Sequence, residues 1–184
     1  MRSPACPASR RRRLRESMDL FYPQRSDSFL AELVEVYRDL WMGTYRDRTA
    51  LIPGACDTVT GLSAAGYRLG VATAKSRRGL ERELELSGLG SCFAATRTID
   101  EAPPKPHPGM LLGLCEELGV PPSRTLMIGD TTFDLDMART AGAAALGVLT
   151  GSHGRERLAL SAPLAILPTV TEVPAWLAAP ASRR

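Results

Sequence analysis

The stretch TLMIGDTTFDLDMARTAG, residues 125–142, contains two carboxylates at a spacing that suits metal-assisted chemistry. Asp130 directly follows a short apolar run, and Asp134 comes one helical turn later. Magnesium prefers hard oxygen ligands and often uses only one or two protein carboxylates beside waters and a substrate phosphate. Asp130 is therefore a candidate Mg²⁺ ligand, and Asp134 is a candidate catalytic residue.

A phosphate group also needs cations and hydrogen-bond donors, and two other segments could supply them. Lys105 lies between prolines in PPKPHP, which stiffen the backbone and limit where its ammonium can move. A cation fixed in this way would neutralise charge that develops in a transition state. Thr73 offers a hydroxyl, and the backbone N–H groups of Ala74 and Lys75 could form an anion-binding nest for phosphoryl oxygens.

Each of these residues also has an ordinary structural explanation. A threonine at a strand end is usually a turn residue, and an aspartate after glycine is most often a helix N-cap. Their joint occurrence, each at the carboxyl end of a predicted strand, is what favours a phosphate site. By contrast, we expect His107 to face solvent, Arg77 and Arg78 to form an exposed basic turn, and Asp136 to point away from Asp134.

From residue 55 onward, helical and strand patterns alternate between Gly-rich and Pro-rich turns. We predict helices at 55–65, 76–88, 110–119 and 133–142, and strands at 67–73, 92–96, 125–130, 143–149 and 164–167. This alternation is typical of an α/β fold with a parallel sheet and helices on both faces. Ligands of such sheets bind beyond the carboxyl ends of the strands, so Thr73, Lys105 and Asp130 should converge there.

The first 50 residues have a different character. Residues 1–25 show neither helical nor strand periodicity, and we treat them as an unstructured leader. From residue 28 to 46 the sequence predicts an amphipathic helix with one buried stripe. That stripe comprises Leu30, Leu33, Val34, Tyr37, Leu40 and Trp41.

Composition argues against nucleic-acid and membrane binding. The formal net charge is +3, but five of the 23 Lys and Arg residues lie within residues 10–15, and without them 18 basic residues face 20 acidic ones. A nearly neutral body lacks the basic footprint of a nucleic-acid-binding fold. With 44% hydrophobic residues and no apolar run near 20 residues, the chain is expected to be soluble. The Arg-rich segment is more simply a solvated charge run than a contact for RNA, membrane or an import receptor.

The four cysteines, Cys6, Cys56, Cys92 and Cys115, lie far apart and match no zinc or disulfide pattern. No apolar signal segment precedes them. A cytoplasmic location is the simplest expectation, and an organellar transit peptide is the alternative because residues 1–15 are rich in Arg and free of acids.

Together these motifs resemble the haloacid dehalogenase-like (HAD) superfamily, and most closely its phosphoglycolate phosphatase-like group with a helical cap. LGVATAKS at Thr73 is similar to the second motif of the family, and KPHPGML at Lys105 is similar to the third. The fourth motif, G-D-x-x-x-D-x-x-x-A-x-x-A-G, matches from Gly129 through Asp130 and Asp134 to Gly142. The resemblance covers about residues 26–179.

The resemblance implies a Mg²⁺-dependent phosphatase of small phosphorylated metabolites, such as phosphoglycolate. In the family, an aspartate attacks phosphorus to form an aspartyl-phosphate, and a second aspartate two residues later acts as acid and base. Asp130 would help to hold Mg²⁺, while Thr73 and Lys105 would bind phosphoryl oxygens. Residues 26–50 would form part of the helical cap, and residues 51–184 would form a Rossmann-like core.

The sequence departs from the family at one place. The first motif, D-x-D-G-T after an apolar strand, should precede the cap, and the 184 residues contain no such stretch. Asp19 follows no strand and lacks the Gly-Thr, so it does not qualify as the nucleophile. In the family this strand lies in the middle of the sheet, and its loss leaves neighbouring strands with unpaired backbone groups.

We expect this chain to be an impaired phosphatase whose start is truncated or misread. A non-catalytic remnant that binds phosphate or a protein partner is the alternative. Haloacid dehalogenation itself ranks lower, because a metal-binding GDTTFD segment has little use in a metal-free displacement. The sequence does not indicate an oligomeric state.

Overall fold

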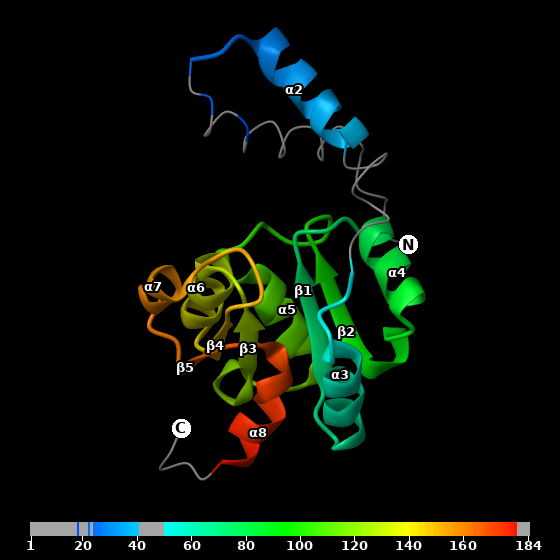
Figure 1. The fold of residues 1–184 in the computed structure, drawn as a ribbon, viewed down its shortest axis with the longest axis vertical. Coiled ribbons are helices and arrows are strands. Elements are labelled where there is room, and N and C mark those ends of the chain that lie inside the picture. Colours follow the sequence, from blue (N-terminus) through cyan, green and yellow to red (C-terminus); the bar gives the residue numbers. More distant parts are fainter. Residues whose placement is uncertain (1–17, 19–21, 23, 41–49, 180–184) are drawn as a thin grey trace. The chain divides into compact units, whose positions relative to one another are not determined.

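The computed structural model describes residues 18, 22, 24–40 and 50–179. The chain divides into two compact units, one ending at Ala50 and one beginning at Leu51 (Figure 1). The predicted leader lies almost wholly outside the described residues, so its character remains a prediction.

The first unit contains helix α2, Asp27–Leu40. Ser26 precedes it, and the Ser26 hydroxyl accepts a hydrogen bond from the Phe29 N–H at 3.3 Å. Leu30 and Val34 are buried, whereas Tyr37 and Leu40 are exposed, so the predicted stripe is confirmed only in its first half. The predicted extension to residue 46, including Trp41, lies outside the described residues.

The second unit alternates strands and helices as the sequence predicts. Its strands are β1 Leu69–Thr73, β2 Phe93–Thr98, β3 Leu126–Gly129, β4 Ala144–Val148 and β5 Ala165–Leu167. Its α-helices are α3 Ala55–Ala64, α4 Arg77–Ser87, α5 Gly109–Leu118, α6 Thr132–Ala141, α7 Arg155–Ala159 and α8 Val173–Ala178. The α/β class and the order of the predicted elements are therefore confirmed. Helices α7 and α8 were not predicted, because five or six residues are too few to show a helical period.

The strands form two parallel sheets instead of one continuous sheet. One has the order β1-β2 and the other the order β3-β4-β5. In the first sheet Thr73 pairs with Thr98, and in the second Gly129 pairs with Gly147. Among the described residues, β1 and β3 are not paired with each other. The division falls between the strands that end in the second and fourth motifs.

A common hydrophobic core holds the two sheets together. Helix α5 packs on β1 and β2, helix α6 packs on β3 and β4, and the two helices contact each other. Their largest buried side chains include Met110, Leu135 and Met137. Ala72 of β1 and Met127 of β3 both pack against this cluster, so one core underlies both sheets.

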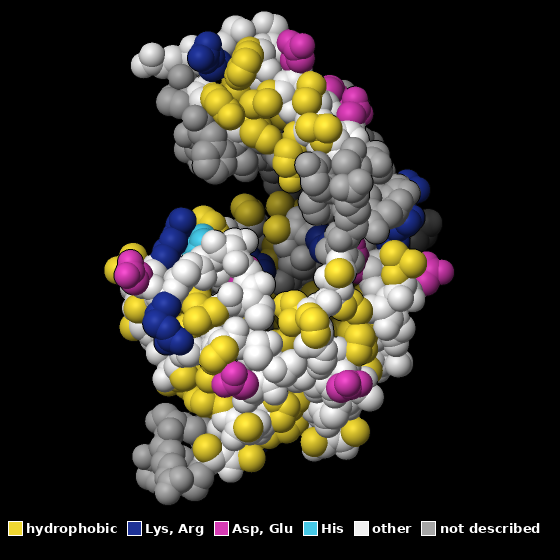
Figure 2. All heavy atoms as spheres, viewed as in Figure 1, with side chains coloured by type: hydrophobic (Ala, Val, Ile, Leu, Met, Phe, Trp, Pro, Cys, Tyr) yellow, Lys and Arg dark blue, Asp and Glu magenta, His cyan; other side chains and the backbone are white. Residues whose placement is uncertain are grey.

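The surface of the second unit is mixed in charge. On the face drawn in Figure 2, Lys and Arg side chains are interspersed with Asp and Glu side chains, and its described residues form no extended basic stripe. Within the described ranges, no helix has both the length and the apolar character needed to cross a membrane.

Replacing Leu135 by alanine tests the importance of the common core. Leu135 is fully buried, so Leu135→Ala is expected to lower the free energy of unfolding by about 2–5 kcal/mol. Leu160→Ala is the matched control, because Leu160 is 83% exposed and its loss should change stability by less than about 0.5 kcal/mol. Urea denaturation followed by circular dichroism measures both, and similar losses for the two variants would contradict the assigned core.

Candidate active site

Thr73 ends β1, and the turn after it leads directly into α4. The Thr73 hydroxyl oxygen accepts a hydrogen bond from the Lys75 N–H at 3.1 Å, so this N–H is already used within the turn. The Thr73 hydroxyl proton remains available for another acceptor. Ser76 caps α4 by accepting from the Gly79 N–H at 3.2 Å. The Lys75 ammonium, just before this helix, lies 3.0 Å from Oε1 of Glu83 in α4.

Lys105 and Asp134 form a short ion pair that is largely buried. The Lys105 Nζ lies 2.5 Å from Asp134 Oδ1, and the side chains are only 16% and 7% exposed. The second oxygen, Oδ2, accepts from the Thr131 hydroxyl at 2.7 Å and from the Thr131 N–H at 3.2 Å. Asp134 is thus both the partner of Lys105 and part of a capping box at the start of α6.

Gly129 makes this close packing possible. A Cβ atom at Gly129 would lie 2.2 Å from the Cβ atom of Asp134, closer than any real contact allows. The glycine of the fourth motif is therefore required by the approach of α6 to the end of β3.

Asp130 follows β3 and is held by the segment after β4. Its Oδ2 accepts from the Ser152 N–H at 2.8 Å, and its carbonyl oxygen accepts from the His153 N–H at 3.2 Å. Within the described part of the chain, Oδ1 of Asp130 has no hydrogen-bond partner, and it is the oxygen best suited to a metal ion. No group of three or more His, Cys, Asp or Glu side chains that could hold a metal gathers among the described residues.

Of the predicted site residues, Lys105 and Asp134 are in contact, and the convergence of Thr73, Lys105 and Asp130 remains a prediction. Lys105 meets Asp134, and Asp130 lies at the end of β3, immediately before the helix that carries Asp134. Thr73 lies at the end of β1, beside Thr98 of β2, from which the chain runs on to Lys105. Among the residues that the structure describes, no hydrogen bond or ion pair joins Thr73 to Lys105 or Asp130. The placement of Ala74, Lys75 and Thr73 as a phosphate nest remains a prediction.

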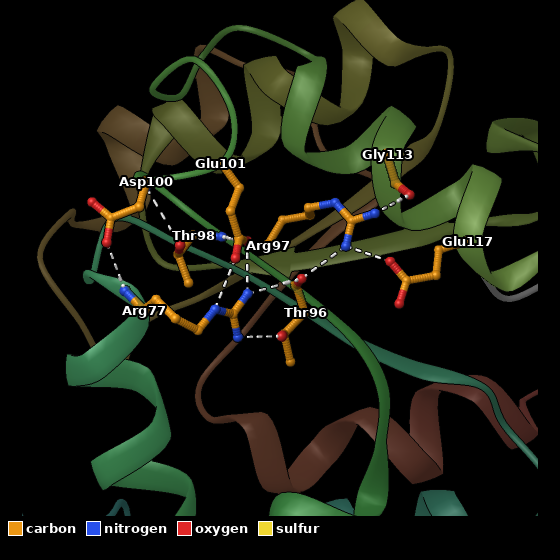
Figure 3. A network of polar contacts seen from close by, with 8 residues as sticks. All are labelled: Arg77, Thr96, Arg97, Thr98, Asp100, Glu101, Gly113 and Glu117. Atoms are coloured by element: carbon orange, nitrogen blue, oxygen red, sulfur yellow. Dashed lines mark hydrogen bonds and ion pairs between the residues drawn. The ribbon is translucent and has the colours of Figure 1, made fainter. Parts of the chain in front are cut away.

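The prediction that Arg77 belongs to an exposed basic turn is wrong. Its guanidinium donates hydrogen bonds to both carboxylate oxygens of Glu101, at 2.8 and 2.6 Å, and to the Thr96 hydroxyl at 2.7 Å (Figure 3). Its backbone N–H donates to the Asp100 carboxylate at 2.9 Å. The Arg77 side chain, 32% exposed, reaches the loop after β2 because β1 and β2 are parallel neighbours, whose carboxyl ends place the start of α4 beside that loop.

This network links the Thr73 turn to the loop that leads to Lys105. Glu101 also accepts from the Thr98 N–H at 3.0 Å, which closes the turn after β2. Arg97, next to Thr96 in β2, donates to the Gly113 carbonyl at 3.1 Å and forms an ion pair with Glu117 (Figure 3). Since Gly113 and Glu117 belong to α5, these contacts also link β2 to that helix. Sequence reasoning missed this arrangement. A usable signal was present, because the acids Asp100 and Glu101 follow the end of β2, and Arg77 begins the helix that follows β1.

The other polar predictions have mixed outcomes. His107 is exposed, as predicted, and its Nδ1 accepts from the Gly109 N–H at 3.1 Å. Arg78 is also exposed. Asp136 pairs with Arg139 on the outer side of α6, at 3.2 Å, and takes no part in the contacts of Asp134.

Burial and hydrogen bonding have opposite effects on the Glu101 carboxyl. Burial alone would raise its pKa, but hydrogen bonds from Arg77 and the Thr98 N–H, with the charges of Arg77 and Arg97, outweigh it and lower the pKa below the ordinary value of 4.5. The hydrogen bond to Glu101 likewise raises the pKa of Arg77, against the effect of burial.

Comparison with known proteins identifies the family of this chain. The sequence profile of the family described as "Haloacid dehalogenase-like hydrolase" matches residues 11–148, three-quarters of the chain. The chain belongs to the haloacid dehalogenase-like hydrolases.

Curated relatives in this hydrolase family carry phosphatase and pyrophosphatase names. The chain is 41% identical over 124 residues to "Probable phosphatase IndB" of Dickeya dadantii, covering 67% of this chain and 54% of that protein. It is 32% identical over 151 residues to "Pyrophosphatase PpaX" of Anoxybacillus flavithermus, covering 82% and 68%. It is 30% identical over 156 residues to "Phosphoglycolate phosphatase" of Escherichia coli K12, covering 82% and 62%. The chain thus spans 54–68% of the length of these relatives.

Solved structures of haloacid dehalogenase-like proteins share the fold. The hydrolase family protein SP0104 of Streptococcus pneumoniae superposes with a TM-score of 0.76 at 23% sequence identity, covering 96% of this chain and 83% of that one. At this identity the likeness concerns the fold alone.

Replacing Glu101 by glutamine tests the Arg77–Glu101 pair through the pH dependence of stability. Because the folded pKa of Glu101 is lowered, its contribution is fully present above about pH 4.5 and is lost as the pH falls through the folded pKa. Above pH 5, Glu101→Gln should therefore melt up to about 3 °C below the wild type. Below pH 4.5 the difference should shrink, and a difference that grows on acidification would contradict the assignment.

Removing the Lys105 ammonium should expose the cost of a buried, unpaired Asp134. Lys105→Met is expected to lower the free energy of unfolding by about 3 kcal/mol, and adding Asp134→Asn should restore at least about 1 kcal/mol. Lys75→Met is the control, because its half-exposed pair with Glu83 should be worth less than about 1 kcal/mol. Chemical denaturation of Lys105→Met, Asp134→Asn, the double variant and Lys75→Met gives all four values, and strictly additive losses at 105 and 134 would argue against coupling.

Proposed function

We propose that this chain carries the phosphate-binding and metal-binding half of a Mg²⁺-dependent phosphomonoester hydrolase that acts on a small phosphorylated metabolite. The Lys105–Asp134 pair beside Asp130, at the carboxyl ends of parallel strands, is the observation that carries the proposal. The names of the relatives support phosphatase chemistry, and phosphoglycolate is one substrate that they suggest. Because another relative is named a pyrophosphatase, we propose a class of small phosphorylated substrates and not phosphoglycolate alone.

The donor set suits magnesium in a limited way. Asp130 has one carboxylate oxygen held by the Ser152 N–H and a second oxygen directed to no described partner, which fits one anionic ligand to Mg²⁺. Asp134 has both oxygens engaged by Lys105 and Thr131 and is not a second ligand in this arrangement. Bound Mg²⁺ would supply charge neutralisation for the phosphoryl group, with waters and the phosphate completing its coordination.

The roles of the chain's own residues follow from their hydrogen-bonding capacity. An ammonium has three protons, and Lys105 gives one to Asp134, so two remain for phosphoryl oxygens. Asp134 acts through Lys105 by holding that ammonium at a fixed position. Thr73 accepts from the Lys75 N–H and keeps its own proton to donate to a phosphoryl oxygen. The residues therefore bind and orient the phosphate from positions that are set before the substrate arrives.

The nucleophile is the part that the described residues do not supply. Among the described residues, Asp134 is the aspartate paired with Lys105, and its oxygens are engaged, while the 184 residues contain no D-x-D-G-T stretch. We therefore propose that the chain by itself is impaired in turnover. A non-catalytic phosphate-binding protein of this fold is the second candidate, and the unpaired facing edges of β1 and β3 favour it. A cytoplasmic setting is part of the proposal, because Cys56, Cys92 and Cys115 are all free thiols.

Turnover of p-nitrophenyl phosphate with and without Mg²⁺ tests the proposal. The 184-residue chain should hydrolyse it near the background rate. A version extended by an apolar strand ending in D-x-D-G-T should gain Mg²⁺-dependent activity by at least about 100-fold, since covalent catalysis then becomes possible.

The matched control is the extended version with the first aspartate of the added motif changed to asparagine, which should return to background. Substantial metal-dependent turnover by the original chain would show that the nucleophile lies elsewhere in it. Binding of inorganic phosphate by both versions without turnover by either would favour the non-catalytic alternative.

A further inference from the structure

The segment Gly151–Ser152–His153 connects β4 to α7 and contacts the start of α6 from more than twenty residues away. Ser152 and His153 each give a backbone N–H to Asp130, at 2.8 and 3.2 Å. In the opposite direction, the Thr132 N–H donates to His153 Nδ1 at 3.0 Å. These three hydrogen bonds join two segments that are separate in sequence.

His153 is almost fully buried, at 9% exposure, and its ring lies 6.0 Å from that of Phe133. Nδ1 of this ring accepts the hydrogen bond from the Thr132 N–H. The ring therefore serves as an acceptor for the first turn of α6 and not as a proton donor there.

Three N–H groups at the start of α6 are consequently used within the protein. The Thr132 N–H is used by His153, the Asp134 N–H by the Thr131 hydroxyl, and the Thr131 N–H by Asp134. These N–H groups hold the protein's own residues in place.

Gly151 shows how tightly Asp130 is held. A Cβ atom at Gly151 would lie 1.9 Å from Asp130 Oδ2, so any side chain there would displace the carboxylate. With Oδ2 fixed by Ser152, the Asp130 carboxylate cannot rotate freely, and Oδ1 is presented in one direction.

We propose that Gly151–Ser152–His153 is a positioning element for Asp130, with His153 as the residue that locks it against α6. The inference rests on the proposed function in one respect, since it takes Asp130 to be a metal ligand. Partners that orient a metal ligand without touching the metal typically change metal affinity by about 10–100-fold when removed.

Metal affinity, measured by titration with Mn²⁺ and detection of free Mn²⁺ by electron paramagnetic resonance, tests this role without relying on activity. His153→Phe keeps a ring but loses the acceptor, and it should weaken Mn²⁺ binding by about 10–100-fold. His153→Asn places an amide oxygen near the position of Nδ1 and should bind within about threefold of the wild type. Rescue by asparagine is a result that a purely space-filling histidine would not give.

His107→Phe is the matched control. His107 also accepts a backbone N–H through Nδ1, at 3.1 Å, but it is exposed and does not contact Asp130, so its loss should leave Mn²⁺ affinity unchanged. If His153→Phe does not fold, His153→Gln replaces it, because the longer side chain puts its amide near the Nε2 position and away from Thr132.

The outcomes separate this inference from the proposed function. Wild-type affinity in a folded His153→Phe or His153→Gln, or an asparagine variant as weak as either, would overturn the positioning role and leave the metal site standing. Failure of the wild type to bind Mn²⁺ any better than Asp130→Asn would overturn the metal assignment and this inference together.

Discussion

The ion pair between Lys105 and Asp134 joins two parts of the fold that share no strand pairing. Lys105 comes from the loop after β2, in the first sheet, and Asp134 comes from α6, which follows β3 in the second. Its short distance and low exposure place it in a setting where charges interact strongly and where losing either partner is costly. With the packing of α5 against α6, this contact keeps the carboxyl ends of the two sheets in one site.

Around this pair, most polar groups are used to hold other groups in place. Asp134 fixes Lys105, Thr131 fixes Asp134, and the segment after β4 fixes Asp130. The Arg77–Glu101 pair links the start of α4, which follows Thr73, to the loop that leads from β2 to Lys105. Such an arrangement suits a site that acts by positioning and electrostatics, because its donors need little reorganisation when a phosphate arrives. It also explains why glycines occur at 129 and 151, where neighbouring carboxylates leave no room for a side chain.

The division of the strands into two sheets fits the departure of the sequence from the family pattern. The resemblance places the strand with the first motif in the middle of a single sheet, and the break lies between β1 and β3, the strands that end in the second and fourth motifs. The common core and the polar contacts persist across this break, because helices α5 and α6 supply them and the strand edges do not. This departure is the basis for proposing an impaired chain.

The sequence by itself determined the order of strands and helices, the carboxyl-end positions of Thr73, Lys105 and Asp130, and the family, because periodicity and motif spacing are local properties of the chain. It could not predict the pairing of Arg77 with Glu101 or the hydrogen bonds that join His153 to the segment of Asp130 and Thr132. Each of these contacts is between residues about twenty positions apart, which strand pairing brings together. The sequence also could not predict that both carboxylate oxygens of Asp134 accept hydrogen bonds, one from Lys105 and one from Thr131. Only the tertiary structure decided which carboxylate remains available for a metal, since that depends on how α6 packs over Gly129 at the end of β3.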